Sequence, residues 1–196
     1  MAVTVLDDKT ALVLIDLQTS TLAAATRPYP TVDVVARAAE LADAFRAAGA
    51  PVVLVRMATS PDGADAVPGR SEAVRLAGGR ARPYDLGPVV EPLAGHDGDV
   101  LVTKRNWGAF HGTDLDVQLR RRGVTQIVLG GIATSLGVES TARAAHEHGY
   151  HLTFAVDAMT DIDEDAHRHS VSYLFPLIGE PGTTKEILAL LAAARA

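Results

Sequence analysis

The chain has 196 residues, of which 47% are hydrophobic, and its formal net charge at pH 7 is −6. This length can fill one hydrophobic core and is short for two, so we expect a single domain spanning residues 1–196. The basic residues are scattered rather than clustered, which argues against a surface that binds nucleic acid or anionic membrane. The chain contains no cysteine, which excludes disulfide bonds, thiolate zinc sites and thiol catalysis.

The N-terminal sequence MAVTVLDDKT lacks the basic start and the long apolar core of a signal peptide. No apolar run in the chain approaches the roughly 18 residues that a membrane-spanning helix requires. We therefore expect a cytoplasmic protein that does not associate with membranes.

Strands and amphipathic helices alternate along most of the chain. Residues 11–15 (ALVLI) form a continuous apolar run, as in a strand buried on both faces. Residues 34–45 carry apolar side chains at helical spacing, a glycine ends that helix, and residues 52–55 form the next strand. The same order of helix, glycine and strand returns in residues 115–129 and 138–156. This order predicts an α/β domain with a mainly parallel β-sheet flanked by helices on both faces, in a Rossmann-like three-layer arrangement.

The periodic pattern fails between residues 58 and 98, which are rich in glycine and proline. A structureless loop of this length is unusual in a compact domain, so we expect a partly ordered excursion with short helical turns. Such an excursion either covers the site or meets another subunit, and the alternative is a surface insertion without function. The segment carries four arginines, Arg70, Arg75, Arg80 and Arg82.

A strand-to-helix turn lies within residues 128–145 (VLGGIATSLGVESTARAA). Thr134 or Ser135 can cap the new helix, which would leave the backbone N–H groups of residues 136–138 pointing out of its N-terminus. Such a cradle suits a carboxylate or a developing oxyanion. Ser135 is also a candidate nucleophile, although a capping role alone would account for a serine at this position.

Parallel strands would bring three separated segments to one edge of the sheet. Asp16 follows the first strand, Lys104 ends the strand at residues 99–103, and Gly137 lies in the turn described above. Open α/β sheets bind their ligands at the carboxyl ends of their strands, so we expect these three residues to share one crevice. A buried ion pair that joins two strand ends is the alternative role of Asp16 and Lys104.

These segments resemble the isochorismatase-like (cysteine hydrolase) superfamily. Residues 130–138 (GGIATSLGV) are similar to its G-[IV]-A-T-x-x-C-V signature, in which a nucleophilic cysteine begins a helix, and Gly137 holds that place here. Asp16 in VLIDLQ and Lys104 in VTKRNWGAF match the superfamily's acidic residue and lysine. The resemblance implies an isochorismatase-like fold, a homo-oligomer (dimer or tetramer) and a non-proline cis peptide at Ile132–Ala133.

The resemblance also implies a reaction. In cysteine members the aspartate and lysine prepare a thiol to attack an amide or imide carbonyl. Gly137 has no side chain and cannot provide that thiol. The superfamily's true isochorismatases similarly have glycine there and cleave a vinyl ether without a covalent intermediate. By that resemblance Asp16 protonates the enol-ether carbon and water attacks the resulting oxocarbenium. The pKa of Asp16 then has to be raised by burial against the opposing pull of Lys104.

The residues that we expect to act in catalysis are Asp16, Lys104 and Gly137. The residues that we expect to contact a small-molecule substrate surround the same strand ends; they are Gln18, Trp107, Phe110, His111, Ala133, Thr134, Ser135, Leu136 and Val138.

Several of the expected substrate contacts also have a purely structural interpretation. Gln18 either orients substrate or water, or it caps a loop. Trp107 and Phe110 either form the apolar wall of a pocket or belong to the core. His111 is either a proton donor or polar wall, or a loop histidine bonded to the backbone.

A metal site is not supported, and we expect no cofactor. The chain has two groups of closely spaced histidines, but residues two apart on a helix point to different faces and would not bind one metal ion together. Histidines are also favoured in the last turn of a helix for electrostatic reasons. The superfamily's zinc-dependent nicotinamidases carry an Asp-x-His element after the second strand, where this chain has Arg56, Met57 and Ala58. The histidines concerned are His146, His148 and His151, and His167 and His169.

The leading hypothesis is a cysteine-independent hydrolase of a small anionic molecule, with an isochorismate-type vinyl ether as the best-motivated substrate. One alternative is an amide or imide hydrolase that uses activated water or Ser135. Another is a non-catalytic small-molecule-binding protein that kept the pocket after losing its nucleophile.

Overall fold

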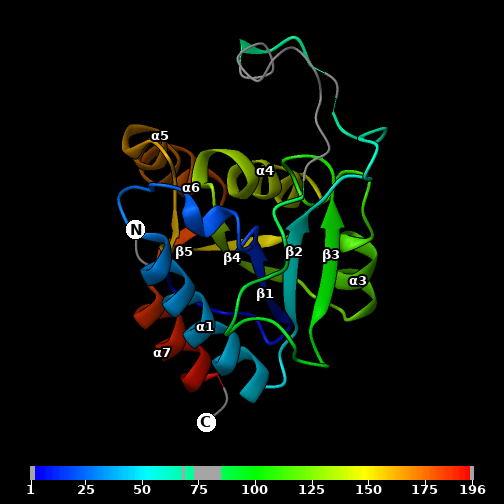
Figure 1. Ribbon diagram of the computed structural model, residues 1–196. Helices are drawn as coiled ribbons and strands as arrows, with labels where there is room; N and C mark the ends of the chain where they lie inside the picture. The colour runs from blue at the N-terminus through cyan, green and yellow to red at the C-terminus, as the bar shows by residue number, and fades with distance from the viewer. Residues whose placement is uncertain (1–2, 68, 73–84, 195–196) are drawn as a thin grey trace.

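The strands form one sheet in the order β3-β2-β1-β4-β5-β6, and each ladder between neighbours is parallel (Figure 1). This description comes from a computed structural model that describes residues 3–67, 69–72 and 85–194. The strand bounds are Thr10–Ile15 (β1), Val52–Met57 (β2), Val100–Lys104 (β3), Gln126–Ile132 (β4), His151–Thr160 (β5) and Glu180–Gly182 (β6). The predicted parallel sheet is confirmed.

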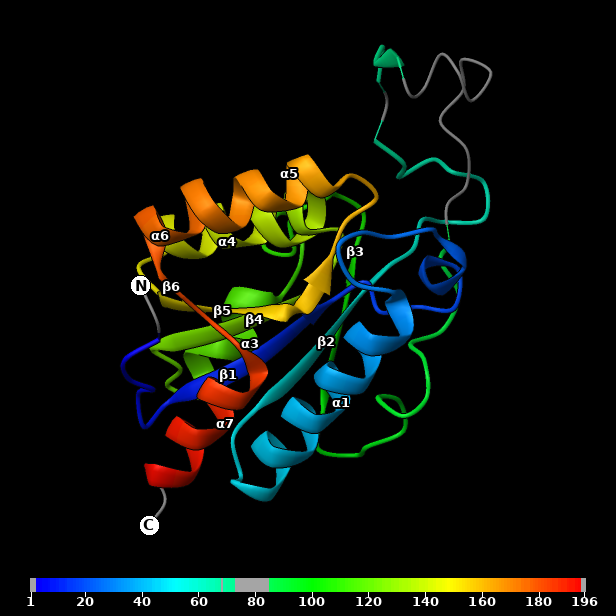
Figure 2. The ribbon, with the colours of Figure 1, turned by 90° about the vertical axis from the view of Figure 1, so that its left-hand side faces the viewer.

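Helices cover both faces of the sheet (Figures 1 and 2). On one face, α1 (Thr31–Ala47) packs against β1 and β5, and α7 (Thr184–Ala193) packs against α1 and β5; the β1 side chains Leu12 and Leu14 belong to this core. The other face buries Val13 and Ile15 against helices of the second layer, as the alternation of side chains along a strand requires. The helices of that layer are α3 (Leu115–Arg121), α4 (Glu139–Glu147), α5 (Glu164–His169) and α6 (Phe175–Ile178). The predicted three-layer α/β domain is confirmed.

The central strands are buried because both of their faces are covered. Every residue of β1 and of β4 is buried, which explains why both strands lack polar residues after Thr10 and Gln126, their first residues. Among the residues that the structure describes, every helix is too short or too polar to cross a lipid bilayer.

The turn after β4 differs from its prediction. A single π-helical turn, η2 (Thr134–Val138), leads directly into α4, and no side chain caps it, so the predicted cap at Thr134 or Ser135 is wrong. The residue before the turn is Ala133, and the Ile132–Ala133 peptide is cis, as the resemblance implies. π-turns of this kind occur frequently at functional sites.

The excursion after β2 is described only in part. Residues 68 and 73–84, which include Arg75, Arg80 and Arg82, lie outside the described residues. The described residues that follow β2 extend beyond the carboxyl edge of the sheet (Figure 1). Isolated bridges join Gln18 to Val89 and Ala58 to Asp85 where the chain returns. The predicted helical turns and the role of the excursion remain predictions.

A continuous helical segment made of α5, η3 (Ser170–Leu174) and α6 is anchored to the sheet by one aromatic pair. Phe175 stacks on Phe154 of β5 with ring centroids 3.9 Å apart, and both side chains are fully buried.

Replacing Phe175 should therefore loosen this segment from the sheet. We expect Phe175→Ala to lower the free energy of unfolding by about 3–5 kcal/mol, because it removes a buried ring and leaves a cavity. Chemical denaturation of the purified protein measures the change. Leu177→Ala, at a side chain that is 65% exposed, is the control and should change that free energy by no more than about 0.5 kcal/mol. Equal effects of the two variants would contradict this account of the anchor.

Candidate active site

The structure brings Asp16, Lys104 and Gly137 together at the carboxyl edge of the sheet. Lys104 Nζ lies 2.7 Å from Asp16 Oδ2, and both side chains are buried. A Cβ atom built on Gly137 would lie 3.3 Å from the same Asp16 oxygen. The expected convergence of three separate segments is therefore present, and their catalytic role remains a prediction.

Lys104 reaches Asp16 across the end of β2, which lies between their strands in the sheet. Met57, the last residue of β2, pairs in register with Lys104, and its Sδ is 3.9 Å from Lys104 Nζ. Lys104 Nζ also donates a hydrogen bond to the carbonyl of Asn106 at 3.1 Å. The ammonium is thus fixed over the end of β2, with the carboxylate of Asp16 as its anionic partner.

The backbone of Asp16 directs this carboxyl group. In strand phase Asp16 would follow Leu12 and Leu14 onto the α1 face, whereas Lys104 is in phase with Val102 on the opposite face. Asp16 has φ +52°, in the left-handed region that residues other than glycine rarely adopt. This conformation takes the side chain out of the strand alternation, and strained positions of this kind cluster at functional sites.

The Asp16 carboxyl has one paired and one unpaired oxygen. Oδ2 faces Lys104, while the buried Oδ1 has no hydrogen-bond partner in the described part of the chain. Burial raises the pKa of Asp16 to about 6, against the charge and hydrogen bond of Lys104, which lower it. Because Oδ2 faces an ammonium group, a proton taken up by this carboxyl belongs on Oδ1. The carboxyl can thus give or accept a proton near pH 6 through that oxygen.

Two of the three amide groups in the predicted cradle are bonded within the turn. The N–H groups of Leu136 and Val138 both donate to the carbonyl of Ala133 at 3.2 Å, so neither points out of the helix. The N–H of Ser135 donates to Asp161 Oδ2 at 2.7 Å. The prediction is wrong for Leu136 and Val138 because the π-turn satisfies their N–H groups internally, which a regular helix start would not do.

Gln18 ties loops together and does not face a substrate. Its Oε1 accepts from the N–H of Met57 at 2.7 Å, and its Nε2 donates to the carbonyls of Gly87 at 2.5 Å and Met57 at 3.3 Å. The side chain is fully buried. The interpretation of Gln18 as a substrate contact is wrong, because the backbone occupies the hydrogen-bonding groups of its amide.

The residues after Lys104 divide between core and surface. Phe110 is buried and lies 5.0 Å from His148 and 5.9 Å from Tyr150 between ring centroids, so it belongs to the core and not to a pocket wall. The Trp107 side chain is 60% exposed, while its carbonyl oxygen would lie 3.5 Å from a Cβ on Gly137. His111 is exposed, and its carbonyl accepts from the Asn106 side chain at 3.4 Å.

Thr134 is bonded to a histidine that the sequence did not connect with it. Thr134 Oγ1 lies 2.9 Å from His167 Nδ1, and both residues are buried. Burial lowers the pKa of His167 and so favours its neutral ring, whereas the charges of Asp161 and Glu164 act in the opposite direction. His167 therefore lies beside Thr134, whereas the residue bonded to the Ser135 backbone is Asp161.

The other histidine of that pair faces away from the sheet. His169 is exposed and packs against Tyr173 at 5.2 Å between ring centroids, so the two histidines point to different faces of the helix. Within the described ranges, no three His, Asp or Glu side chains are grouped as metal ligands would be.

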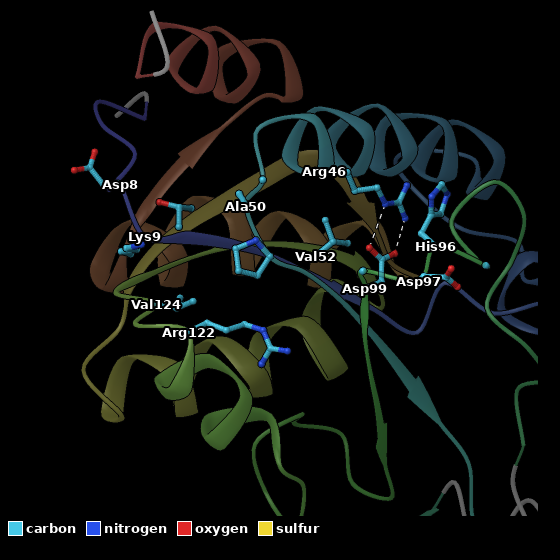
Figure 3. A pocket seen from close by; sticks show the side chains of 15 residues that line it. Asp8, Lys9, Arg46, Ala50, Val52, His96, Asp97, Asp99, Arg122 and Val124 are labelled. Atoms are coloured by element: carbon cyan, nitrogen blue, oxygen red, sulfur yellow. Dashed lines mark hydrogen bonds and ion pairs between the residues drawn. The ribbon is translucent and has the colours of Figure 1, made fainter.

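A large depression of about 830 Å³ lies at the opposite, amino-terminal edge of the sheet (Figure 3). Thr10 and Val52, which begin β1 and β2, are part of its lining. Within its lining Arg46 is paired with Asp99 at 2.7 Å, as Figure 3 shows. The depression does not include Asp16 or Lys104, and we place the candidate active site at the carboxyl edge.

Comparisons with known proteins match most of the chain to isochorismatase family proteins. The model of the isochorismatase domain matches residues 10–186. The isochorismatase family protein YecD of Escherichia coli O157:H7 is 44% identical over 182 residues, which are 93% of this chain and 96% of YecD. The solved structure of an isochorismatase family protein from Burkholderia thailandensis has a TM-score of 0.88 and 43% identity, covering 96% of this chain and 98% of that one. The ureidoacrylate amidohydrolase RutB of Methylobacterium radiotolerans is 31% identical over 165 residues, covering 76% of this chain and 64% of RutB.

Removing the Lys104 charge should raise the pKa of Asp16 further. Burial already raises this pKa to about 6, and Lys104 is the group that opposes burial. We therefore expect Asp16 in Lys104→Met to titrate above pH 6, as measured by ¹³C NMR of the carboxyl carbon and assigned with Asp16→Asn. Lys185→Met removes an exposed lysine and should leave the titration of Asp16 unchanged. An unchanged or lower pKa in Lys104→Met would show that Lys104 does not set the charge of this carboxyl.

Proposed function

Because the chain belongs to the isochorismatase family, we propose that it is a cysteine-independent hydrolase of a small anionic molecule, with Asp16 as general acid or base and Lys104 as its electrostatic partner. The observation that carries the proposal is the Asp16 carboxyl group. It is buried, it is paired through Oδ2 only, and its pKa is raised to about 6. A group with these properties can transfer protons near neutral pH.

The place beside this carboxyl carries no side chain. Cysteine is absent from the sequence, and the Cβ of any residue at position 137 would come within 3.3 Å of Asp16 Oδ2. A protein nucleophile at this position would therefore have to replace Gly137. Since glycine offers none, the attacking group in the proposed reaction is water.

An isochorismate-type vinyl ether is the substrate class that these groups suit best. The proton on Asp16 Oδ1 passes to the terminal carbon of the enol ether, whose electron pair forms the new C–H bond and leaves an oxocarbenium ion. Water adds to that ion, and the hemiketal loses its alcohol to give pyruvate. Lys104 stabilises the Asp16 carboxylate that the first step produces, and the proton released from the attacking water restores the acid.

Amide hydrolysis by activated water is the second candidate, and one relative favours it. RutB is named as acting on ureidoacrylate, and it matches 76% of this chain. In this reaction the Asp16 carboxylate accepts a proton from the attacking water through Oδ1, and the same proton passes to the leaving nitrogen as the C–N bond breaks. The same residue then acts as a base, so the two reactions require opposite protonation states of Asp16.

Turnover by the purified protein tests the proposal. We expect isochorismate to release pyruvate, and we expect Asp16→Asn to lower the rate by at least about 100-fold, because the transferable proton is lost. Ureidoacrylate, followed by its consumption, tests the second candidate under the same conditions. Asp8→Asn changes an exposed aspartate and should retain the full rate. If both substrates bind but neither is consumed, the protein is a non-catalytic binding protein and the proposal fails.

The pH dependence of kcat distinguishes the acid role of Asp16 from the base role. Above its pKa of about 6 the carboxyl loses its proton, so vinyl-ether hydrolysis should fall by about tenfold per pH unit as pH rises. Amide hydrolysis should instead fall as pH drops below that value. In Lys104→Met the pH at which either rate falls should be higher, because this variant removes the charge that lowers the pKa of Asp16. A rate that does not change between pH 5 and pH 8 would rule out either role for a carboxyl with a pKa of about 6.

A further inference from the structure

The segment of residues 161–170 holds the turn at residues 134–139 by side-chain hydrogen bonds at three places. Two of these bonds engage the π-turn itself, and the third engages the first residue of α4. His167 and Ser170 are three residues apart, a spacing that places both on one face of a helix. The bonded pairs are Asp161 Oδ2 with the N–H of Ser135 (2.7 Å), His167 Nδ1 with Thr134 Oγ1 (2.9 Å) and Glu139 Oε2 with Ser170 Oγ (2.6 Å).

The bond between His167 and Thr134 is the most enclosed of the three. Thr134 is fully buried and His167 is only 6% exposed, and the Thr134 hydroxyl is bonded to the ring of His167. The hydroxyl lies three residues before Gly137, within the same π-turn. The carbonyl of Gly137 in turn accepts from Thr141 Oγ1 at 2.7 Å. The turn is thus tied on both sides of the glycine that faces Asp16.

We propose that His167 is a positioning residue, which acts through Thr134 to fix the π-turn and so keeps Gly137 closed over the carboxyl of Asp16. The backbone of the turn is part of the wall that separates this carboxyl from water, since a Cβ on Gly137 would lie 3.3 Å from Asp16 Oδ2. A turn released at Thr134 admits solvent to that wall. The kinetic consequence rests on the proposed function, whereas the solvation of Asp16 does not.

Variants at both ends of the hydrogen bond test this inference. His167→Leu and Thr134→Val remove the bond, while His167→Asn keeps a polar atom close to the position of Nδ1. In the first two variants water should reach Asp16, so its pKa should fall from about 6 towards 3.8, as followed by ¹³C NMR. On the proposed substrate kcat should fall by roughly 10- to 100-fold with a smaller change in KM, because the reacting groups lose their alignment. In His167→Asn the pKa of Asp16 and kcat should stay close to their values in the unmutated protein.

Two controls separate positioning from a general loss of stability. His169→Leu changes an exposed histidine at the end of the same helix and should leave the titration of Asp16 and the rate unchanged. The double variant of His167→Leu and Thr134→Val should be no worse than either single variant, because both act on one bond.

The result that would overturn the inference is an Asp16 titration at the same pH in the unmutated protein, His167→Leu and Thr134→Val. If His167→Leu does not fold, Thr134→Val and His167→Asn give the same comparison. If neither substrate is consumed by the unmutated protein, the proposed function fails, and the titration of Asp16 still decides whether His167 positions the turn.

Discussion

The ion pair between Asp16 and Lys104 is the constraint on which the rest of the site depends. It joins the ends of β1 and β3 across β2, so it exists only if the strands are parallel and end together. Moving two charges out of water costs several kcal/mol for each ion, and their attraction offsets this only when other groups are also satisfied. Lys104 has the Asn106 carbonyl as a further partner, whereas Asp16 Oδ1 has none among the described residues. The pair is therefore incomplete as a stabilising element and suited to proton transfer.

The same incompleteness links the fold to the chemistry. A carboxyl satisfied at both oxygens would stay ionised, and one without a cation would stay protonated at neutral pH. Asp16 lies between these limits because burial outweighs Lys104, and its pKa is about 6. Its left-handed backbone places it there, and the π-turn encloses it on the side of Gly137. The site thus combines a proton donor or acceptor with an adjacent place that holds no side chain.

The sequence predicted what depends on periodicity and failed where single-residue geometry decides. The apolar runs and glycines gave the parallel sheet, and strand ends of a parallel sheet share one edge, so Asp16 and Lys104 could be placed together. The bond between Thr134 and His167 joins residues 33 positions apart, and only the packing of α5 on the turn creates it. The prediction that the N–H groups of Leu136 and Val138 form an anion cradle was wrong because the sequence does not distinguish a π-turn from a regular helix start. The local pattern around Gln18 and Phe110 is equally compatible with a pocket, a loop tie and the core.

Neutron diffraction from crystals at pD about 5, below the Asp16 pKa of about 6, would test the central claim most directly, because it locates the proton on this carboxyl. The account predicts a deuteron on Asp16 Oδ1, with Oδ2 accepting from a fully deuterated Lys104 ammonium. A carboxyl without a deuteron under these conditions, or a neutral Lys104, would contradict it. In the first case Asp16 would be an ionised partner of Lys104 even below pH 6 and could not be the acid of a vinyl-ether hydrolase; in the second, Lys104 could not stabilise the Asp16 carboxylate by its charge.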